Sequence, residues 1–190
     1  MAIIEKLIAK AQAGDATIVL PEGQDPRVMK AAASIAADNI AKVLVLASAE
    51  EKAEAGTGVS FDGLDVTFID YLNAPEREEL AAAFQEHRAH KGVTLEAARE
   101  TMKNRLYFAN MMLRVGKADG LVAGSISSTG DMLRAAFQCV GTAPGIKTGS
   151  STFVMDLAAP TASGDETILF ADCGVNPDPD AAMLVDIALA

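Results

Sequence analysis

ADGLVAGSISSTGDMLRAAFQCVGT, residues 118–142, is the stretch that decides the fold. An apolar strand at 118–123 runs into small and hydroxylated residues at 124–130, and a helix with an early Arg134 starts at about Asp131. This order is typical of open α/β sheets, in which ligands bind beyond the carboxyl ends of the strands. The loop therefore predicts a binding site.

The loop carries the groups of an oxyanion site. Gly124 and Gly130 allow the backbone to come close to a bound anion. The following helix presents free N–H groups and the positive end of its dipole. The hydroxyls that can donate to phosphate oxygens are those of Ser125, Ser127, Ser128 and Thr129. Arg134 adds a bidentate cation. The alternative is an ordinary helix N-cap among small residues. The loop lacks the Gly-Lys-Ser/Thr ending of a nucleotide P-loop, so ATP hydrolysis is not implied.

A second basic cluster lies in EHRAHKG, residues 86–92, with both histidines of the chain. It contains His87, Arg88, His90 and Lys91. Two interpretations remain open at this point. The cluster is a solvated helix end, where cations suit the negative end of the dipole, or it is an anion contact.

The rest of the chain alternates short apolar strands with amphipathic helices. We predict helices over 3–14, 25–38, 49–56, 74–88, 94–102 and 104–117, and strands over 16–23, 41–48 and 64–70. Asp25 and Pro26 form a helix start. This pattern predicts an α/β protein of three α/β/α layers with a mostly parallel sheet.

A domain boundary is expected near residues 142–150, which combine Pro, Gly and small polar residues. A first α/β domain at 1–145 would hold the phosphate-binding loop, and 146–190 would start a second α/β domain that is incomplete. Strands at 150–159 and 166–174 are joined by too short a turn for a helical crossover, so an antiparallel pair is expected. The chain stops inside an apolar helix that starts near 178, which suggests truncation.

The net charge of the chain disfavours two classes of binding partner. A net charge of −10 disfavours nucleic acid and anionic membranes, and no apolar run approaches the roughly 20 residues of a membrane span. Cys139 and Cys173 lie far apart without metal-binding spacing, so two reduced, buried thiols in a cytoplasmic protein are expected. The Met residues at 102, 111 and 112 are expected in the core. No metal site is predicted.

Four segments resemble the phosphate acetyltransferases. They are HKGVTLEAA at 90–98, YFANMMLRVGKADGLVAGSISSTGDMLRAAFQCVGTAPGIKT at 107–148, SSTFVM at 150–155 and FADCGVNPDPDAAMLVDIA at 170–188. They occur in the order and at the spacing of that family. The chain is similar to the N-terminal portion of such proteins.

The resemblance implies an enzyme, an acyltransferase that moves an acetyl group reversibly between coenzyme A and inorganic phosphate. It implies an isocitrate dehydrogenase-like fold, a homodimer when full length, and no cofactor besides these substrates. Arg134 and Arg88 occupy the places of family arginines tied to phosphate or coenzyme A binding and to charge stabilisation. The remaining residues expected to bind substrate are Ser125, Ser127, Ser128, Thr129, Gly130 and Lys91.

The resemblance also leaves parts open. The family's Ser-Arg pair and the Asp thought to deprotonate the thiol lie beyond residue 190, so the 190-residue chain alone is expected to be inactive. Two alternatives to this function remain. One is a phosphate butyryltransferase, and the other is a non-catalytic anion-binding or oligomerisation module of the same fold. Acyl-chain preference, reaction direction, oligomeric interface and regulation are not specified by these residues.

Overall fold

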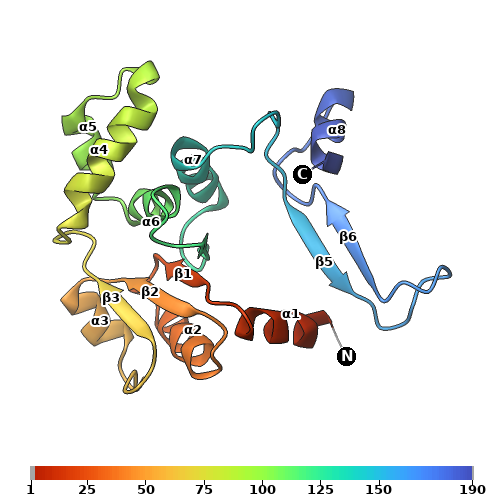
Figure 1. Cartoon of the computed structure of the whole chain (residues 1–190), viewed down its shortest axis with the longest axis horizontal. Helices are drawn as coiled ribbons and strands as arrows, with labels where there is room; N and C mark the ends of the chain where they lie inside the picture. The colour runs from red at the N-terminus through yellow and green to blue at the C-terminus, as the bar shows by residue number, and fades with distance from the viewer. Residues whose placement is uncertain (1–2, 190) are drawn as a thin grey trace. The chain divides into compact units, whose positions relative to one another are not determined.

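The computed structural model describes residues 3–189 (Figure 1). The chain divides into two compact units with a boundary between Gly141 and Thr142. One unit is Ile8–Gly141, and the other contains the chain from Thr142 onward together with its start, up to Leu7. The division into domains at 1–145 and 146–190 stays a prediction.

The unit Ile8–Gly141 is built on a parallel sheet of four strands in the order β3-β2-β1-β4. The strands are β1 (Thr17–Leu20), β2 (Lys42–Leu46), β3 (Val66–Ile69) and β4 (Gly120–Leu121). From β1 the chain first builds outward through β2 to β3, and then returns to place β4 on the other side of β1. The winding direction therefore reverses between β1 and β4, and such a reversal opens a crevice at the carboxyl ends of the strands.

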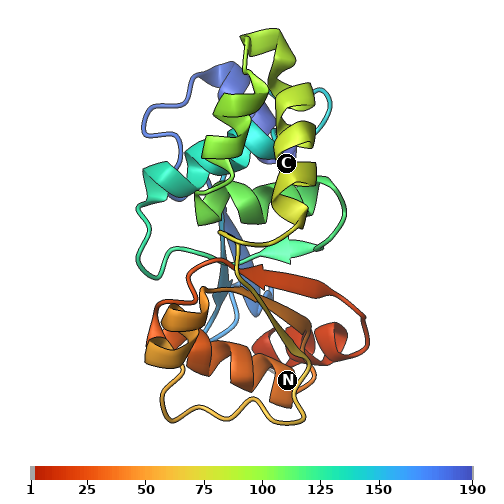
Figure 2. The same ribbon diagram turned by 90° about the vertical axis from the view of Figure 1, so that its left-hand side faces the viewer.

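Helices cover both faces of this sheet (Figure 2). The helices of the chain up to Gly141 are α1 (Ile3–Gln12), α2 (Pro26–Ala37), α3 (Ala49–Ala55), α4 (Glu76–Arg88), α5 (Leu95–Thr101), α6 (Arg105–Arg114) and α7 (Thr129–Cys139). The core on one face is formed with α2 and α3, and the core on the other with α4 to α7. The predicted α/β class with a mostly parallel sheet is confirmed.

The two cores follow from the alternation of side chains along the strands. Val19 and Leu46 point into the core shared with α4 to α7, and their neighbours Leu20 and Val45 point into the core shared with α2 and α3. Because both faces are covered, the strands read as continuous apolar runs in the sequence. The Met residues at 102, 111 and 112 are buried as predicted.

Side-chain caps fix where several helices begin. Asp25 accepts the N–H of Arg27 at 2.8 Å and Pro26 is the first residue of α2, as the sequence predicts. The helix after the opening loop, α7, was predicted from about Asp131 but begins at Thr129, because the side chain of Ser128 caps it. The preceding strand is also shorter than the predicted 118–123 and pairs with β1 only over Gly120–Leu121.

Between residues 142 and 189, the second unit contains a two-stranded sheet and one helix. Strands β5 (Thr152–Asp156) and β6 (Thr167–Ala171) pair antiparallel, which confirms that prediction, and α8 spans Ala181–Leu189. Asp172 closes the strand end by accepting N–H groups from residues 174–176. Large apolar side chains of both strands are more than half exposed, among them Phe153 and Leu169. This unit therefore buries little apolar surface on its own.

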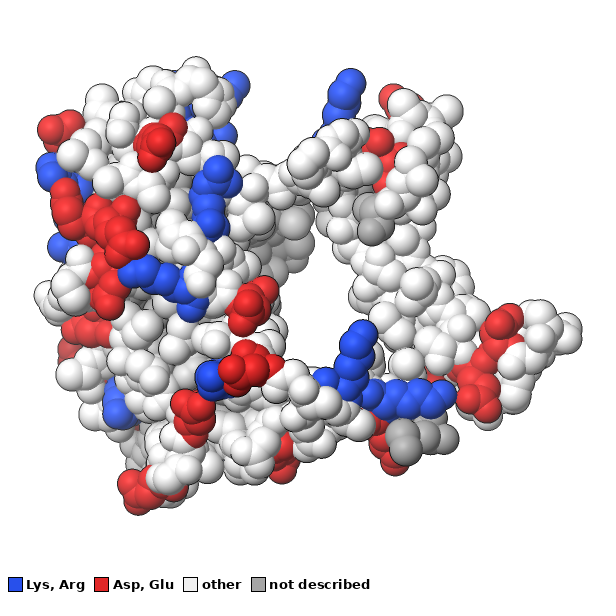
Figure 3. Space-filling model, in the orientation of Figure 1, with Lys and Arg blue, Asp and Glu red and all other residues white. Residues whose placement is uncertain are grey.

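The surface carries acidic and basic side chains side by side on the face that Figure 3 shows. The net charge of the sequence is −10. Among the described residues, no helix is both long and apolar enough to cross a membrane.

Candidate functional site

The carboxyl ends of β1 and β4 face each other at the reversal point of the parallel sheet. The segment after β1 begins with Pro21, Glu22 and Gly23, and the segment after β4 leads through residues 122–128 into α7. In sheets of this kind this edge is where ligands bind. The predicted loop therefore lies at the edge where its function was expected.

The backbone N–H groups of this loop are already bonded within the fold. Gly124 and Ser125 donate to Oε2 of Glu22, both at 2.7 Å. Ile126 and Ser127 donate to Oε1 of the same carboxylate, at 3.2 and 2.7 Å. An internal carboxylate therefore occupies the amides of residues 124–127, and they are not free donors for a phosphate.

Glu22 is only 1% exposed. Burial by itself raises the pKa of its carboxyl, but the Ser127 side chain and hydrogen bonds from the amides of Ser125, Ser127 and Ile126 outweigh that effect and lower the pKa. The carboxylate is therefore charged near neutral pH, and its charge is compensated by oriented N–H dipoles rather than by a cation.

Two of the four hydroxyls predicted to bind phosphate also have hydrogen-bond partners in the fold. Ser125 Oγ donates to Asp25 Oδ2 at 2.5 Å. Ser128 Oγ accepts the N–H of Asp131 at 3.2 Å and bonds to its carboxylate at 2.7 Å. Thr129 Oγ1 has no hydrogen-bond partner among residues 3–189. The assignment of these residues to substrate binding stays a prediction.

The first turn of α7 keeps donors that face solvent. Thr129 and Gly130 are the first residues of the helix, where N–H groups have no intrahelical acceptor, and both are exposed. Arg134, 63% exposed in its side chain, pairs with Asp131 at 3.1 Å on the same helix. Exposed pairs of this kind contribute at most about 1 kcal/mol, so an incoming anion can compete for the guanidinium.

The second predicted cluster lies where α4 ends and a short 3-10 helix, η1 (Ala89–Lys91), follows. The Arg88 Nε is buried, and within the described part of the chain it has no hydrogen-bond partner. Burial lowers the pKa of His87, and the charges of Arg114 and Arg88 lower it further. His90 and Lys91 are exposed on η1. The cluster is therefore more than a solvated helix end, because it holds a buried donor without a partner.

The charges of both predicted arginines, Arg134 and Arg88, affect the pKa of the same side chain, Tyr107. Burial raises the pKa of Tyr107, and the charges of Arg134 and Arg88 oppose that rise. Arg114 lies in the same region, where its Nη1 donates to the carbonyl of Cys139 at 3.1 Å. The packing of α4, α6 and α7 thus gathers three arginines that are far apart in the sequence. Arg134 lies one turn into α7, near its electropositive N-terminal end, whereas Arg114 contacts Cys139, the last residue of the helix.

Sequence reasoning missed the polar residues that follow β1. Besides Glu22, Asp25 binds the guanidinium of Arg27, with Nη2 to Oδ2 at 2.6 Å, and Arg27 Nη2 also donates to the carbonyl of Ser125 at 2.9 Å. The signal was present in PEGQDPR, residues 21–27, because charged residues directly after a buried strand lie at the same sheet edge as the predicted loop.

A second missed network joins three further elements at this edge. Arg105, at the start of α6, donates to Glu51 at 2.6 Å and to the hydroxyl of Tyr71 at 2.8 Å, and it also bonds to Gln24. These partners follow β1, β2 and β3 in the chain. No spacing in the sequence predicts that Arg105 connects them.

The predicted burial is confirmed for Cys139 but is wrong for Cys173. Both are free, but only Cys139 is buried, whereas Cys173 is half-buried and its backbone N–H donates to Ser151 Oγ at 3.2 Å. Cys173 lies two residues after β6, in the unit that buries little surface. Within residues 3–189 no cluster of His, Cys, Asp or Glu is arranged to hold a metal.

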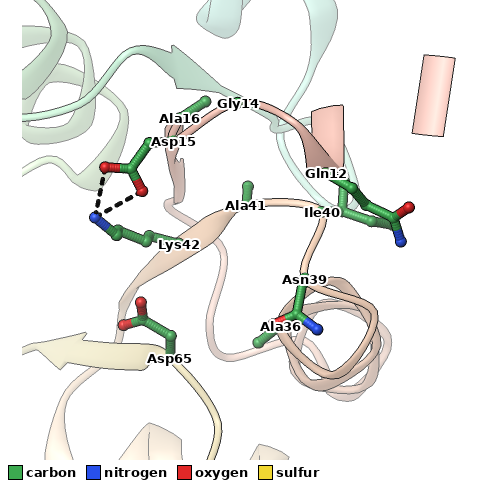
Figure 4. A pocket seen from close by; sticks show the side chains of 10 residues that line it. All are labelled: Gln12, Gly14, Asp15, Ala16, Ala36, Asn39, Ile40, Ala41, Lys42 and Asp65. Atoms are coloured by element: carbon green, nitrogen blue, oxygen red, sulfur yellow. Dashed lines mark hydrogen bonds and ion pairs between the residues drawn. The ribbon is translucent and has the colours of Figure 1, made fainter. Parts of the chain in front are cut away.

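A separate pocket lies at the opposite, amino-terminal edge of the parallel sheet (Figure 4). In it the carboxylate of Asp15 faces the ammonium of Lys42 at 2.8 Å, and Asp65 also lines the pocket. Pairing with Asp15 raises the pKa of Lys42. Ligands of open α/β sheets bind at the other edge, so this pocket is not part of the candidate site.

Comparison with known proteins decides the family. The family model described as "Phosphate acetyl/butaryl transferase" matches residues 2–190. The chain belongs to this family. Members similar to it include the phosphate acetyltransferases of Thermoanaerobacterium thermosaccharolyticum, 43% identical over 189 residues, and of Acetivibrio thermocellus, 42% identical over 190 residues. The alignment covers 100% of this chain but only 57% of each relative.

Solved structures agree with this membership. A phosphotransacetylase from Streptococcus pyogenes matches with a TM-score of 0.87 at 35% identity, over 98% of this chain and 55% of the other. The EutD phosphotransacetylase from Staphylococcus aureus matches with a TM-score of 0.84 at 34% identity, over 98% of this chain and 54% of the other. The chain thus spans little more than half the length of these members of the phosphate acetyl/butyryl transferase family.

Proposed function

We propose that the natural protein to which this chain belongs is a phosphate acetyltransferase, which transfers an acetyl group reversibly between coenzyme A and inorganic phosphate. The observation that carries the proposal is the match to two relatives named phosphate acetyltransferase, which covers this whole chain at 43% and 42% identity. The reaction is acyl transfer between a thiol and a phosphate.

In one direction the thiol of coenzyme A loses its proton to a base, and the thiolate attacks the carbonyl carbon of acetyl phosphate. A carbon–sulfur bond forms, the carbon–oxygen bond to phosphate breaks, and phosphate leaves as the anion. Negative charge builds on the carbonyl oxygen and then on the departing phosphate. Fixed donors aimed at these oxygens lower the barrier, and loss of one such donor typically costs about 10²-fold in rate.

We assign this role to Arg134 and Arg88. The support is that both charges act on Tyr107, and that the Nε of Arg88 is buried without a partner in the described chain. Thr129 and Gly130 add the free donors of the first turn of α7. Lys91 is exposed next to Arg88 and suits an additional phosphate contact of coenzyme A.

Ser125, Ser127 and Ser128 take a less direct part in this proposal. The side chains of Ser125 and Ser128 bond to Asp25 and Asp131, and the backbone N–H of Ser127 donates to Glu22, so they shape the substrate-binding edge from within the fold. No carboxylate among residues 3–189 is assigned as the base for the thiol. Glu22 and Asp25 are poor candidates, because hydrogen bonds lower the pKa of both and their oxygens already accept donors.

The substrates are acetyl-CoA and phosphate in this proposal, with no metal or redox cofactor. A cytoplasmic homodimer without nucleic-acid or membrane partners completes it. The net charge of −10 supports the last part, since an acidic surface repels polyanions.

The test is an assay of the natural full-length protein with acetyl-CoA and phosphate, in which free thiol and acyl phosphate are measured together. We expect the two products in equal amounts, and no thiol release when phosphate is omitted. Butyryl-CoA is the comparison substrate, because the family description names both reactions. A higher kcat/KM for butyryl-CoA, or thiol release without acyl phosphate, contradicts the proposal.

A further inference from the structure

Glu22 is the one group that bonds to four consecutive amides of the described chain, those of residues 124–127. Successive N–H groups that converge in this way form an anion-binding concavity. It lies at the reversal point of the sheet, where such folds commonly bind an external ligand. Here the anion comes from the chain itself, because Glu22 is the second residue after β1.

The backbone on both sides is built for this contact. A Cβ on Gly23 would lie 2.6 Å from the carbonyl oxygen of Leu46, so only glycine lets the turn after β1 pass this close to β2. Gly124 has a φ of +107°, a conformation that L-residues rarely adopt. Asp25 and Arg27 hold the same loop from a second side through Ser125.

The contact also fixes the start of α7. Ser127, the last residue bonded to Glu22, directly precedes Ser128, whose side chain caps the helix. Thr129 and Gly130 follow as the first helical residues. Where the first turn of α7 lies, and with it Arg134, therefore depends on where the loop is held.

We infer that Glu22 is a positioning residue: its carboxylate holds residues 124–127 as one fixed turn and thereby places the first turn of α7 for anion binding. Glu22 does not touch the substrate in this account. It acts through the loop, and its effect on turnover rests on the proposed function.

The substitution Glu22→Gln isolates the effect, because it keeps the shape of the side chain. Each carboxylate oxygen accepts two of the four amides. Whichever oxygen becomes an NH2 group, two amides lose their acceptor and face a donor. The cost falls on the loop, since a buried amide without a partner is unfavourable.

Asp119→Asn is the control. Asp119 is also a carboxylate that accepts a backbone amide, the N–H of Thr17 at 2.8 Å, but it does so where β1 begins, at the opposite edge of the sheet. The substitution is expected to affect that edge without changing the acceptors of residues 124–127.

The experiment uses the natural full-length protein as wild type, Glu22→Gln and Asp119→Asn. Hydrogen exchange is followed in peptides that cover residues 122–133, and kcat/KM is measured for phosphate. We expect exchange in this segment to accelerate about 10-fold or more in Glu22→Gln only, because it loses amide acceptors. We also expect kcat/KM for phosphate to fall about 10-fold or more in Glu22→Gln, since small misplacements of binding groups are costly in catalysis.

Unchanged exchange in Glu22→Gln overturns the inference, as does faster exchange with kcat/KM within twofold of wild type. If wild type itself transfers no acetyl group, the proposed function fails. The positioning role of Glu22 is then tested by hydrogen exchange alone. In that case faster exchange at both 124–127 and the first turn of α7 supports the positioning role. Faster exchange confined to 124–127 overturns it.

Discussion

The charged residues of the candidate site are of two kinds, which differ in their partners. The oxygens of Glu22 accept backbone amides, and those of Asp25 accept the Ser125 hydroxyl and the Arg27 guanidinium. These two carboxylates therefore stabilise the fold. Arg88 has a buried Nε without a partner in the described chain, and Arg134 has only an exposed pairing with Asp131. Groups with spare hydrogen-bonding capacity are the ones suited to an incoming anion.

The titration of His87 reports on the positive field of this region. Burial and the charges of Arg114 and Arg88 lower its pKa from the ordinary value of 6.5. His87 is therefore expected to be neutral at pH 7. Because the unfolded chain binds this proton more readily, the contribution of His87 to stability is lost as pH falls below about 6.5.

Histidine resonances followed by NMR against pH measure this directly, with His87→Gln to assign the signal. We expect a midpoint below 6.5, and a further drop on addition of salt would be inconsistent with the positive neighbours, because salt screens their repulsion. A midpoint above 6.5 contradicts the placement of His87 beside the arginines.

Cys139 is expected to be chemically inert in the folded protein. Burial raises the pKa of its thiol from 9.0 to about 12, so the thiolate fraction at pH 8 falls by roughly a thousandfold. In a Cys173→Ser variant, a thiol reagent such as Ellman's reagent should react with Cys139 only after denaturation. Rapid labelling of the native variant would show that this thiol is accessible.

Among the helices and strands, the sequence predicted best the features that depend on residues close together in the chain. The apolar runs predicted β1, β2 and β3, and Asp25-Pro26 predicted the start of α2, because each signal lies within a few residues. The start of α7 was predicted two residues late, since Ser128 and Thr129 are equally plausible caps in the sequence.

The candidate site shows the limit of local signals. Arg134 and Arg88 could be singled out from their segments and from the family resemblance. The occupation of the loop amides by Glu22 could not, because it joins residues about a hundred positions apart and depends on β1 lying next to β4. The same holds for Arg105 and its partners Glu51 and Tyr71.

The turn between β1 and α2 is expected to tolerate no side chain at Gly23. A methyl group there would approach the carbonyl oxygen of Leu46 to 2.6 Å and Cγ1 of Val45 to 2.7 Å. Gly23→Ala should therefore lower the free energy of unfolding by about 1–3 kcal/mol, measured by urea denaturation. Gly174→Ala is the control, because a Cβ there meets no atom within 4 Å. Equal stability of the two variants contradicts the close approach.

At the scale of the whole molecule, the two units differ in how much they bury. The unit Ile8–Gly141 has a core on each face of its sheet. The unit from Thr142 onward exposes apolar side chains on both strands of its hairpin, such as Val154 and Phe170. An isolated two-stranded sheet is marginally stable in water. The units should therefore behave differently when they are separated.

A fragment of residues 8–141 is expected to unfold cooperatively on heating, because its parallel sheet is covered on both faces. A fragment of residues 142–190 is expected to show no cooperative transition. Circular dichroism against temperature measures both. A cooperative transition in the second fragment, or none in the first, contradicts this account of where the stability resides.

In the proposed function, Arg134 and Arg88 bind and stabilise the phosphate during acetyl transfer by the natural full-length protein. The most direct measurement is kcat/KM for phosphate in Arg134→Ala and Arg88→Ala, with Arg99→Ala as control, since Arg99 pairs with Glu78 on the surface. We predict a loss of about 10²-fold for each of the first two variants and a change within twofold for the control. Wild-type values of kcat/KM in both site variants would contradict the account.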